Sequence, residues 1–189
     1  MADIETGKLL YHLTDIKNLD SILADGLKPR SELTGFTDVA DPDILEKRKK
    51  LKLEEQVPFH FFGRNPFDGG VQVANPDKNF VLITVTRALA RNNNWKVIPK
   101  HPLADDDISL MDYDDGFAAI DWAKMNEREY NDPESKSVCM AECLSPNTVA
   151  SSRFLSIFVK DAAIESEVRK LLDKAGVSPH LNINSTLFV

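Results

Sequence analysis

Residues 9–26 read LLYHLTDIKNLDSILADG and place a strand pattern directly before a helix pattern. The apolar run at 9–13 predicts a short β-strand. Thr14 or Asp15 can cap a following helix, and Gly26 is suited to end it. The apolar residues of that helix recur at helical spacing, at Ile16, Leu19, Ile22 and Leu23. The chain is therefore expected to begin with a strand that leads straight into a helix N-terminus.

Beyond this unit, strand patterns dominate the middle of the chain and helix patterns lie near both ends. We predict strands at 9–13, 57–62, 81–86, 137–144 and 154–159, with an edge strand at 182–189. We predict helices at 43–53, around Trp122 and at 162–175. The region 87–119 shows a short helix pattern and a candidate strand at 97–98, but most of it is expected to be loop. The segment 63–70 is dense in turn formers. The pattern favours an α+β fold, with residues 1–189 forming a single domain.

The composition limits the classes of protein to consider. With 42% hydrophobic residues among 189, the chain can bury a sizeable core, which excludes predominant disorder. No window reaches the roughly 18 uninterrupted apolar residues of a membrane span, and the first residues lack a secretory signal. Cys139 and Cys143 are too few for a disulfide framework, and their spacing does not resemble a zinc site. We therefore expect a cytoplasmic protein without a membrane or metal partner.

The charge balance restricts how the protein could contact nucleic acid. The chain has 23 Lys and Arg against 30 Asp and Glu, a net charge of -7. A broad, sequence-blind nucleic-acid clamp usually has the opposite sign, so any contact with DNA or RNA should be local. The run KRKK at 47–50, which includes Arg48, is the place where a polyphosphate or nucleic-acid strand would bind. Such a run is more often a solvated helix face.

Two further residues carry chemistry that the pattern alone leaves open. Glu142 lies in an otherwise apolar run, so it is either outward-facing on a half-buried strand or buried for a functional reason. His12 lies at the end of the first predicted strand, two residues before Thr14. It is either a structural histidine or part of a ligand site in which the strand end and the helix N-terminus converge.

Four short motifs follow one another along the chain. They are HLTDIKNLDSIL at 12–23, ILEKR at 44–48, VPFHF at 57–61 with RNPF at 64–67, and MAE at 140–142 downstream of Asp121 and Trp122. In this order the motifs resemble those of the DarT family of nucleic-acid ADP-ribosyltransferase toxins. The sequence departs from the family pattern where His60 replaces a tyrosine, Gly63 a proline and Phe67 a methionine. It also ends in LFV at 187–189, where a Tyr-Phe ending is common in the family.

The resemblance implies a fold, a substrate and a set of site residues. The fold would be an ADP-ribosyltransferase-like split β-sheet core with flanking helices, and the substrate would be NAD. The residues that would hold NAD are His12, the backbone of Leu13, Thr14, Ser21 and Pro29. Arg48 would contact the NAD phosphates and the target base, and Glu142 would be the catalytic glutamate. The segment 105–137 would correspond to the family's substrate-facing loop region.

The chemistry of the reaction explains these residue types. Breaking the bond between nicotinamide and ribose develops oxocarbenium character, which a carboxylate beside the ribose 2-hydroxyl stabilises. The same carboxylate can accept a proton from the attacking base. An arginine provides a fixed cationic fork for the pyrophosphate or for negative charge that develops on the base.

The leading hypothesis is therefore transfer of ADP-ribose from NAD to a base of single-stranded DNA by a toxin or phage-defence effector. Single strands are favoured because a duplex hides the edge of the base. RNA is a close variant of this acceptor. An NAD glycohydrolase, a protein-directed transferase and a non-catalytic binding or immunity module remain as alternatives. The resemblance also implies a cognate macrodomain antitoxin as partner.

Overall fold

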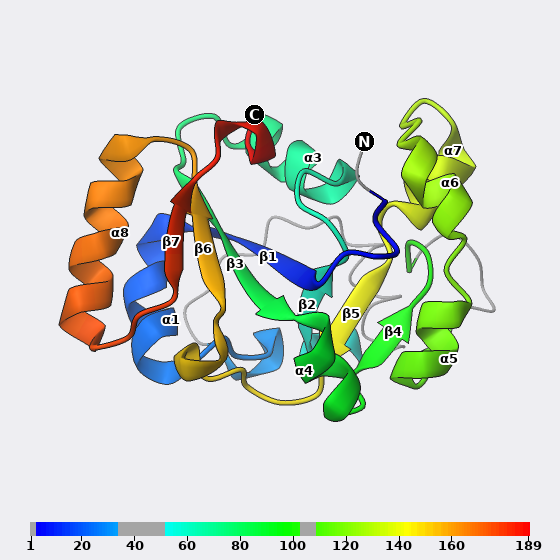
Figure 1. The fold of residues 1–189 in the computed structure, drawn as a ribbon, viewed down its shortest axis with the longest axis horizontal. Coiled ribbons are helices and arrows are strands. Elements are labelled where there is room, and N and C mark those ends of the chain that lie inside the picture. Colours follow the sequence, from blue (N-terminus) through cyan, green and yellow to red (C-terminus); the bar gives the residue numbers. More distant parts are fainter. Residues whose placement is uncertain (1–2, 34–51, 103–108) are drawn as a thin grey trace.

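The structure, a computed structural model, describes residues 3–33, 52–102 and 109–189. Seven strands form one sheet in the order β4-β5-β2-β1-β3-β6-β7 (Figure 1). The strands are β1 Leu9–Asp15, β2 Val57–His60, β3 Phe80–Thr86, β4 Lys96–Ile98, β5 Glu142–Ser145, β6 Ser156–Val159 and β7 His180–Ile183. Neighbouring strands are antiparallel except for the parallel pair β6 and β7.

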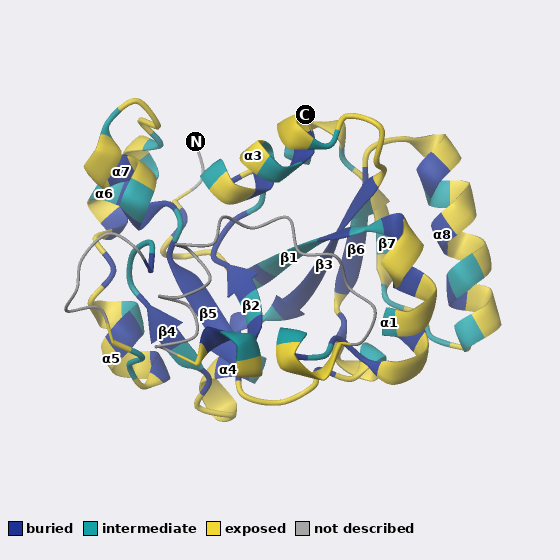
Figure 2. Cartoon of the chain, turned by 180° about the vertical axis from the view of Figure 1, so that it is seen from behind, coloured by how far each residue is buried: buried dark blue, intermediate teal, exposed yellow. Residues whose placement is uncertain are grey.

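The helices of the described residues are α1 Leu19–Asp25, α3 Pro66–Ala74, α4 Arg87–Asn92, α5 Tyr113–Ala118, α6 Trp122–Glu127, α7 Pro133–Val138 and α8 Ala162–Ala175. Most of them lie at the two ends of the sheet, whereas α3 and α4 lie near its middle (Figure 1). Figure 1 shows α1 and α8 at the end that carries β6 and β7, and α5, α6 and α7 at the end that carries β4 and β5. Figure 2 shows that buried residues are concentrated in the strands, whereas the outer sides of the helices are exposed.

The sheet is split between β1 and β2. β1 pairs with β3 through all seven of its residues, but it pairs with β2 only through Tyr11 and His60. Within the described residues, the edge of β1 beyond Tyr11 that faces β2 is therefore not part of a ladder. Unpaired backbone groups at such an edge need other hydrogen-bond partners, so this edge is suited to binding a ligand.

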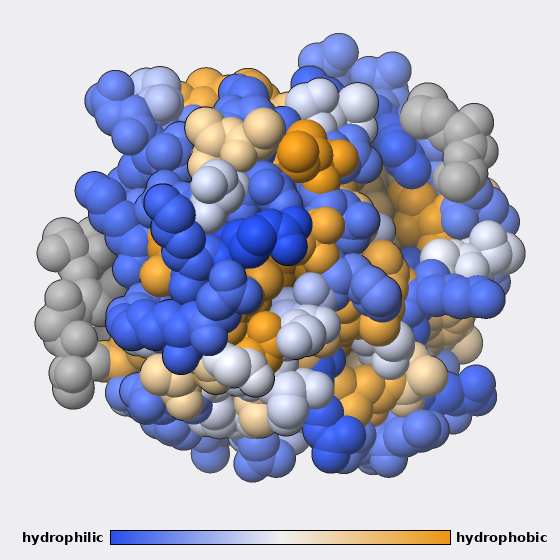
Figure 3. All heavy atoms as spheres, turned by 60° about the vertical axis from the view of Figure 1, so that its left-hand side comes forward, coloured by the Kyte–Doolittle hydropathy of each residue, from blue (hydrophilic) through white to orange (hydrophobic). Residues whose placement is uncertain are grey.

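The apolar pattern of the sequence explains the core. The β3 segment FVLITVT is buried along almost its whole length and forms the centre of one half-sheet. Helix α8 buries Ile164, Val168 and Leu172, and burial of side chains of this size stabilises a fold by about 1.5–3 kcal/mol each. Figure 3, in which the α8 side of the molecule comes forward, shows mainly hydrophilic residues on that outer surface.

Several elements confirm the sequence-based expectations. The first strand, the helix after it, the strand at β3 and the helix α8 lie where they were expected, and β1 extends two residues further to Asp15. A short helix does contain Trp122. Most of the helix predicted at 43–53 lies outside the described residues, and Leu53–Glu55 forms a 3-10 turn.

Four expectations were wrong, and local capping explains two of them. The strand predicted at 137–144 begins only at Glu142, because Asp132 caps a helix that has Pro133 in its first turn. The turn predicted at 63–70 contains the start of α3, because the Asn65 side chain accepts a hydrogen bond from the Asp68 backbone N–H. In both places a helix start signal prevails over the pattern of the residues that follow.

The other two corrections concern segments whose structure depends on distant partners. In the region 87–119, α4 and β4 confirm the expected short helix and the candidate strand at 97–98, but α5 replaces part of the expected loop. Strand β4 is stabilised by pairing with β5. The edge strand predicted at 182–189 is instead β7 at His180–Ile183, followed by a 3-10 turn at Ser185–Leu187. Pairing of β7 with β6 places the strand earlier than the apolar residues of the C-terminus suggested.

Candidate active site

The register of the sheet brings three side chains into one row at the split. Tyr11 on β1 lies opposite His60 on β2, and His60 lies opposite Glu142 on β5. Directly opposite residues of antiparallel strands have Cβ atoms about 4.5–5.5 Å apart and point to the same face of the sheet. Glu142 is therefore a close neighbour of His60, at the point where the two half-sheets meet.

Glu142 is buried, with 6% of its surface exposed. This excludes the outward-facing orientation that the sequence pattern left open, since an outward-facing carboxylate would be solvated. Glu142 is also the first residue of β5, directly after the turn in which Ala141 N–H donates to the Val138 carbonyl. A carboxylate held in a dry site interacts more strongly with nearby charge than one in water.

His60 holds the peptide that precedes Glu142. Its Nδ1 lies 3.2 Å from the carbonyl oxygen of Ala141, so Nδ1–H donates to that carbonyl. The His60 ring also lies against Phe67, with ring centroids 5.4 Å apart. His60 is therefore placed to fix the start of β5, and with it the Glu142 backbone.

A second histidine, His12, is fixed in one protonation state. Its Nδ1 lies 2.7 Å from the Pro58 carbonyl oxygen, so Nδ1–H donates and Nε2 keeps its lone pair. Burial lowers the pKa of His12 to about 4, and the hydrogen bond to Pro58 opposes this shift only in part. The ring packs on Phe59 at a centroid distance of 5.6 Å. His12 is thus neutral near pH 7 and presents Nε2 as an acceptor for a hydroxyl or amide N–H.

The expected site residues do not all share one face of the sheet. Tyr11 belongs to the row of Glu142, and His12 is the next residue along β1, so strand alternation directs its side chain to the other face. His12 nevertheless lies at the same junction, because it follows directly after Tyr11, which belongs to the row of Glu142. A ligand that contacts both has to reach them through the split between β1 and β2.

Thr14 and Ser21 come together around the start of α1. The Asn18 amide donates to Thr14 Oγ1 at 3.3 Å, and the Ser21 hydroxyl donates to the Asn18 carbonyl at 2.9 Å. Thr14 lies two residues after His12 on β1 and so shares its face. Pro29 is buried further along the chain, just before the 3-10 turn Arg30–Glu32. Arg48, the rest of the run 47–50 and residues 105–108 lie outside the described residues.

Sequence reasoning missed a buried polar group next to His60. Asp68 is 1% exposed, and its Oδ2 accepts from the Asn65 amide at 2.8 Å and from the Arg64 backbone N–H at 3.2 Å. Its other oxygen, Oδ1, is buried and has no hydrogen-bond partner in the part of the chain that the structure describes. Burial raises the pKa of Asp68 to about 6, although His60 and the two backbone hydrogen bonds act in the opposite direction. In the sequence, only the pair Asn65-Pro66, which is typical of a helix start, indicated this network.

The described residues contain no group of three or more His, Cys, Asp or Glu side chains placed to hold a metal ion. None of the helices in the same residues is long and apolar enough to cross a membrane.

A split mixed sheet with a buried glutamate and a neutral histidine at its junction defines the ADP-ribosyltransferase class of fold. The family model described as "ssDNA thymidine ADP-ribosyltransferase, DarT" matches residues 11–189. The chain therefore belongs to the DarT family. It is an NAD-dependent ADP-ribosyltransferase that transfers ADP-ribose to single-stranded DNA.

Solved structures support the same fold. The chain is similar to DarT of Thermus sp. 2.9 in complex with ADP-ribosylated ssDNA, with a TM-score of 0.80 and 18% identity over 96% of each chain. The same protein in complex with NAD+ gives a TM-score of 0.77 and 17% identity over 97% of this chain and 98% of that one. DarTG of Thermosipho africanus in complex with ADP-ribose gives 0.73 and 22%, over 96% of this chain and 51% of that one. None of the curated proteins matches the chain.

Proposed function

We propose that Glu142 is the catalytic carboxylate for transfer of ADP-ribose to a thymidine of single-stranded DNA. The observation that carries this proposal is the burial of Glu142 at the split, opposite His60. There the carboxylate can stabilise positive charge on the ribose anomeric carbon as the bond to nicotinamide breaks. The nicotinamide nitrogen keeps the electron pair of that bond.

The acceptor chemistry is consistent with a carboxylate base. A thymine base linked to deoxyribose retains a single ring N–H, at N3. The new bond forms between N3 and the anomeric carbon, and the N3 proton passes to Glu142. A general base in such a position contributes about 10²–10⁴-fold to the rate.

His12, Thr14 and the free edge of β1 support the proposed NAD site. His12 offers Nε2 as an acceptor for a ribose hydroxyl, and the backbone of Leu13 lies on the strand edge that the split leaves unpaired. Ser21 and Pro29 are proposed to contribute from α1 and from the turn after it. Arg48 is proposed to bind the NAD phosphates and to stabilise negative charge on the base.

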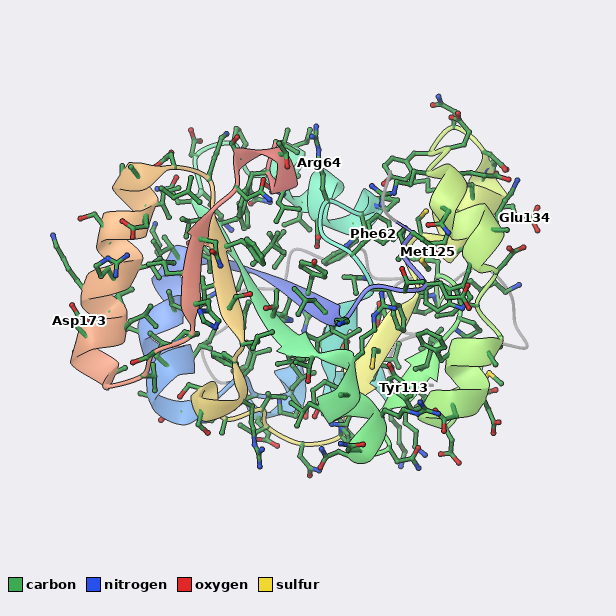
Figure 4. The ribbon with its side chains drawn as sticks, viewed as in Figure 1. Phe62, Arg64, Tyr113, Met125, Glu134 and Asp173 are labelled. Atoms are coloured by element: carbon green, nitrogen blue, oxygen red, sulfur yellow. The ribbon has the colours of Figure 1, made fainter. Side chains whose placement is uncertain are left out.

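Glu142→Gln tests the proposal, because it keeps the size of the side chain and removes its charge. The variant is incubated with labelled NAD and an oligonucleotide that contains one thymidine, and the same oligonucleotide without thymidine serves as a blank. Glu134→Gln, on the exposed surface of α7, is the matched control (Figure 4). We expect transfer to fall about 10²–10⁴-fold in the first variant only. Transfer by Glu142→Gln within a few-fold of the parent would refute the role.

We propose that a cognate macrodomain partner removes the modification, which the match to DarTG of Thermosipho africanus supports because this chain covers 51% of that one. Co-expression with such a partner should relieve toxicity, and Glu142→Gln should be harmless without it.

We further propose that the protein acts in the cytoplasm, where NAD and DNA occur together. If the label entered RNA and not DNA, the acceptor would be RNA.

A further inference from the structure

A basic cleft lies between the start of α3 and the segment that contains α6 and α7. It has a volume of about 740 Å³. The described residues that line it are Gly63, Arg64, Asn65, Pro66, Gly69, Gly70, Arg128, Tyr130, Lys136, Thr186 and Leu187. They include three cations and no Asp or Glu, a formal charge of +3 in a chain whose net charge is -7. Figure 4 labels Arg64 on the α3 side of this cleft and Glu134 on α7.

No carboxylate of the described residues neutralises the three cations. Among the described residues Arg64, Arg128 and Lys136 form no ion pair, whereas Lys124 on α6 binds both Glu127 and Asp132. The Arg128 guanidinium lies 5.2 Å from the centre of the Phe62 ring. Its Nε is buried without a hydrogen-bond partner in the described part of the chain. These charges are therefore available to an anion.

The backbone presents the two arginines in an uncommon conformation. Arg64 has φ 59° and Arg128 has φ 52°, the left-handed region that residues other than glycine seldom adopt. They account for two of the four such non-glycine residues in the described ranges. The Tyr130 hydroxyl donates to the Arg64 carbonyl at 3.4 Å and links the two walls of the cleft. Strained residues of this kind persist at sites where the direction of the side chain matters.

Aromatic side chains accompany the cations. Tyr130 is 37% exposed and lines the cleft, and Phe67, 46% exposed, packs on His60. Cations interleaved with exposed aromatic rings are typical of surfaces that bind single-stranded nucleic acid by phosphate contacts and base stacking. A Cβ atom added at Gly69 or Gly70 would meet no atom within 4 Å, so a phosphate backbone can approach α3 closely.

A chain of residue contacts also links the cleft to the active site. Asn65 lines the cleft and bonds to Asp68, which interacts electrostatically with His60, and His60 lies opposite Glu142. We propose that the basic cleft binds the phosphates of single-stranded DNA adjacent to the target nucleotide, with Tyr130 stacking on a flanking base. This inference rests on the proposed function and adds the path of the strand to it. DNA is favoured over the NAD pyrophosphate because the proposed NAD residues His12 and Thr14 lie on the other face of β1.

Charge-removing variants of the cleft test the path. Arg64→Asn and Arg128→Asn remove a cation and keep a residue that tolerates a left-handed backbone. Lys136→Gln is on an exposed helix position, so it should not affect folding. The matched control is Lys170→Gln on the exposed surface of α8, at the far end of the molecule (Figure 1). Binding of a fluorescent oligonucleotide is measured by anisotropy from 50 to about 200 mM salt, the range over which phosphate contacts weaken.

We expect each cleft variant to weaken binding and to reduce the slope of log K against log salt by about 0.7, the value for one single-strand phosphate contact. The KM for NAD and the properties of Lys170→Gln should not change. Unchanged affinity and slope in all three variants would overturn the inference. A raised KM for NAD with unchanged DNA affinity would overturn it as well and assign the cleft to the NAD donor. DNA binding by Glu142→Gln separates this result from the catalytic role, because that variant should still bind the strand.

Discussion

Replacing Asp68 by asparagine should change how stability depends on pH. The substitution preserves the size of the side chain and one oxygen, which can still accept from the Asn65 amide and the Arg64 backbone N–H. It removes a buried carboxyl group whose Oδ1 is unsatisfied among the described residues. Any difference in pH dependence between the two proteins therefore reports on Asp68.

The size of the effect follows from the pKa shift. Burial raises the pKa of Asp68 from 3.8 to about 6. Between these values the unfolded chain has lost the proton and the folded chain still holds it, so ionisation stabilises the unfolded state as the pH rises. The difference of 6 minus 3.8, or 2.2 units, at about 1.36 kcal/mol per unit gives about 3 kcal/mol. The parent should lose up to about this much free energy of unfolding, relative to Asp68→Asn, between about pH 4 and pH 6.

Urea denaturation of both proteins at intervals from pH 4 to pH 8 measures the difference. Other carboxyl groups, such as Asp112 and Asp132 with lowered pKa values, stabilise the fold as the pH rises, but both proteins contain them. Subtracting one curve from the other removes their contribution. A difference that stays constant with pH would show that Asp68 ionises in the folded protein as it does in the unfolded chain, and would refute the reasoning.

Two more predictions concern the ligand sites. Gly69→Ala should raise the free energy of unfolding by about 0.5–1 kcal/mol, because the new methyl group meets no atom within 4 Å in a helix. It should also weaken DNA binding by narrowing the basic cleft, and equal affinity by anisotropy would contradict that. His12→Phe should raise the KM for NAD about 10-fold with little change in kcat, because the loss of one hydrogen bond to NAD weakens binding by about that factor. Because the pKa of His12 is about 4, ionisation of this residue should not change the parent's KM for NAD between pH 6 and 8. An inflection near pH 6.5 in the KM of the parent that is absent in His12→Phe would show that His12 is not neutral.

The fold could be predicted from sequence where local signals agree. The β1 and α1 unit has an apolar strand, a capping residue and a terminating glycine within one short segment, and Asp15 does cap the turn that precedes α1. Helix α8 is similar, with Asp161 accepting from two backbone N–H groups and Gly176 in the left-handed region. The start of α3 was missed because two glycines follow Pro66 and masked the Asn65 cap.

The site was only partly predictable, because its geometry depends on register. The MAE motif made Glu142 a candidate, but the burial of Glu142 depends on pairing with His60 and Ile98, which lie far away in the sequence. His60 was visible as a departure from the family pattern, yet its bond to the Ala141 carbonyl could not be inferred from spacing. Arg64 belongs to the RNPF motif, and Arg128 and Lys136 lie in the segment 105–137, which the resemblance made substrate-facing. The basic cleft itself could not be predicted, since these segments meet only in the folded protein.

The cleft also reconciles an acidic protein with a nucleic-acid substrate. Salt at physiological strength screens charges beyond about 8 Å, so a phosphate inside the cleft is influenced mainly by Arg64, Arg128 and Lys136. A single strand is flexible enough to place a few phosphates there and keep the rest in solvent. A duplex is stiff over about 50 nm and brings both of its charged strands against the acidic surface. The net charge of -7 therefore does not prevent binding; it favours a single strand over a duplex, in agreement with a reaction that needs an unpaired base.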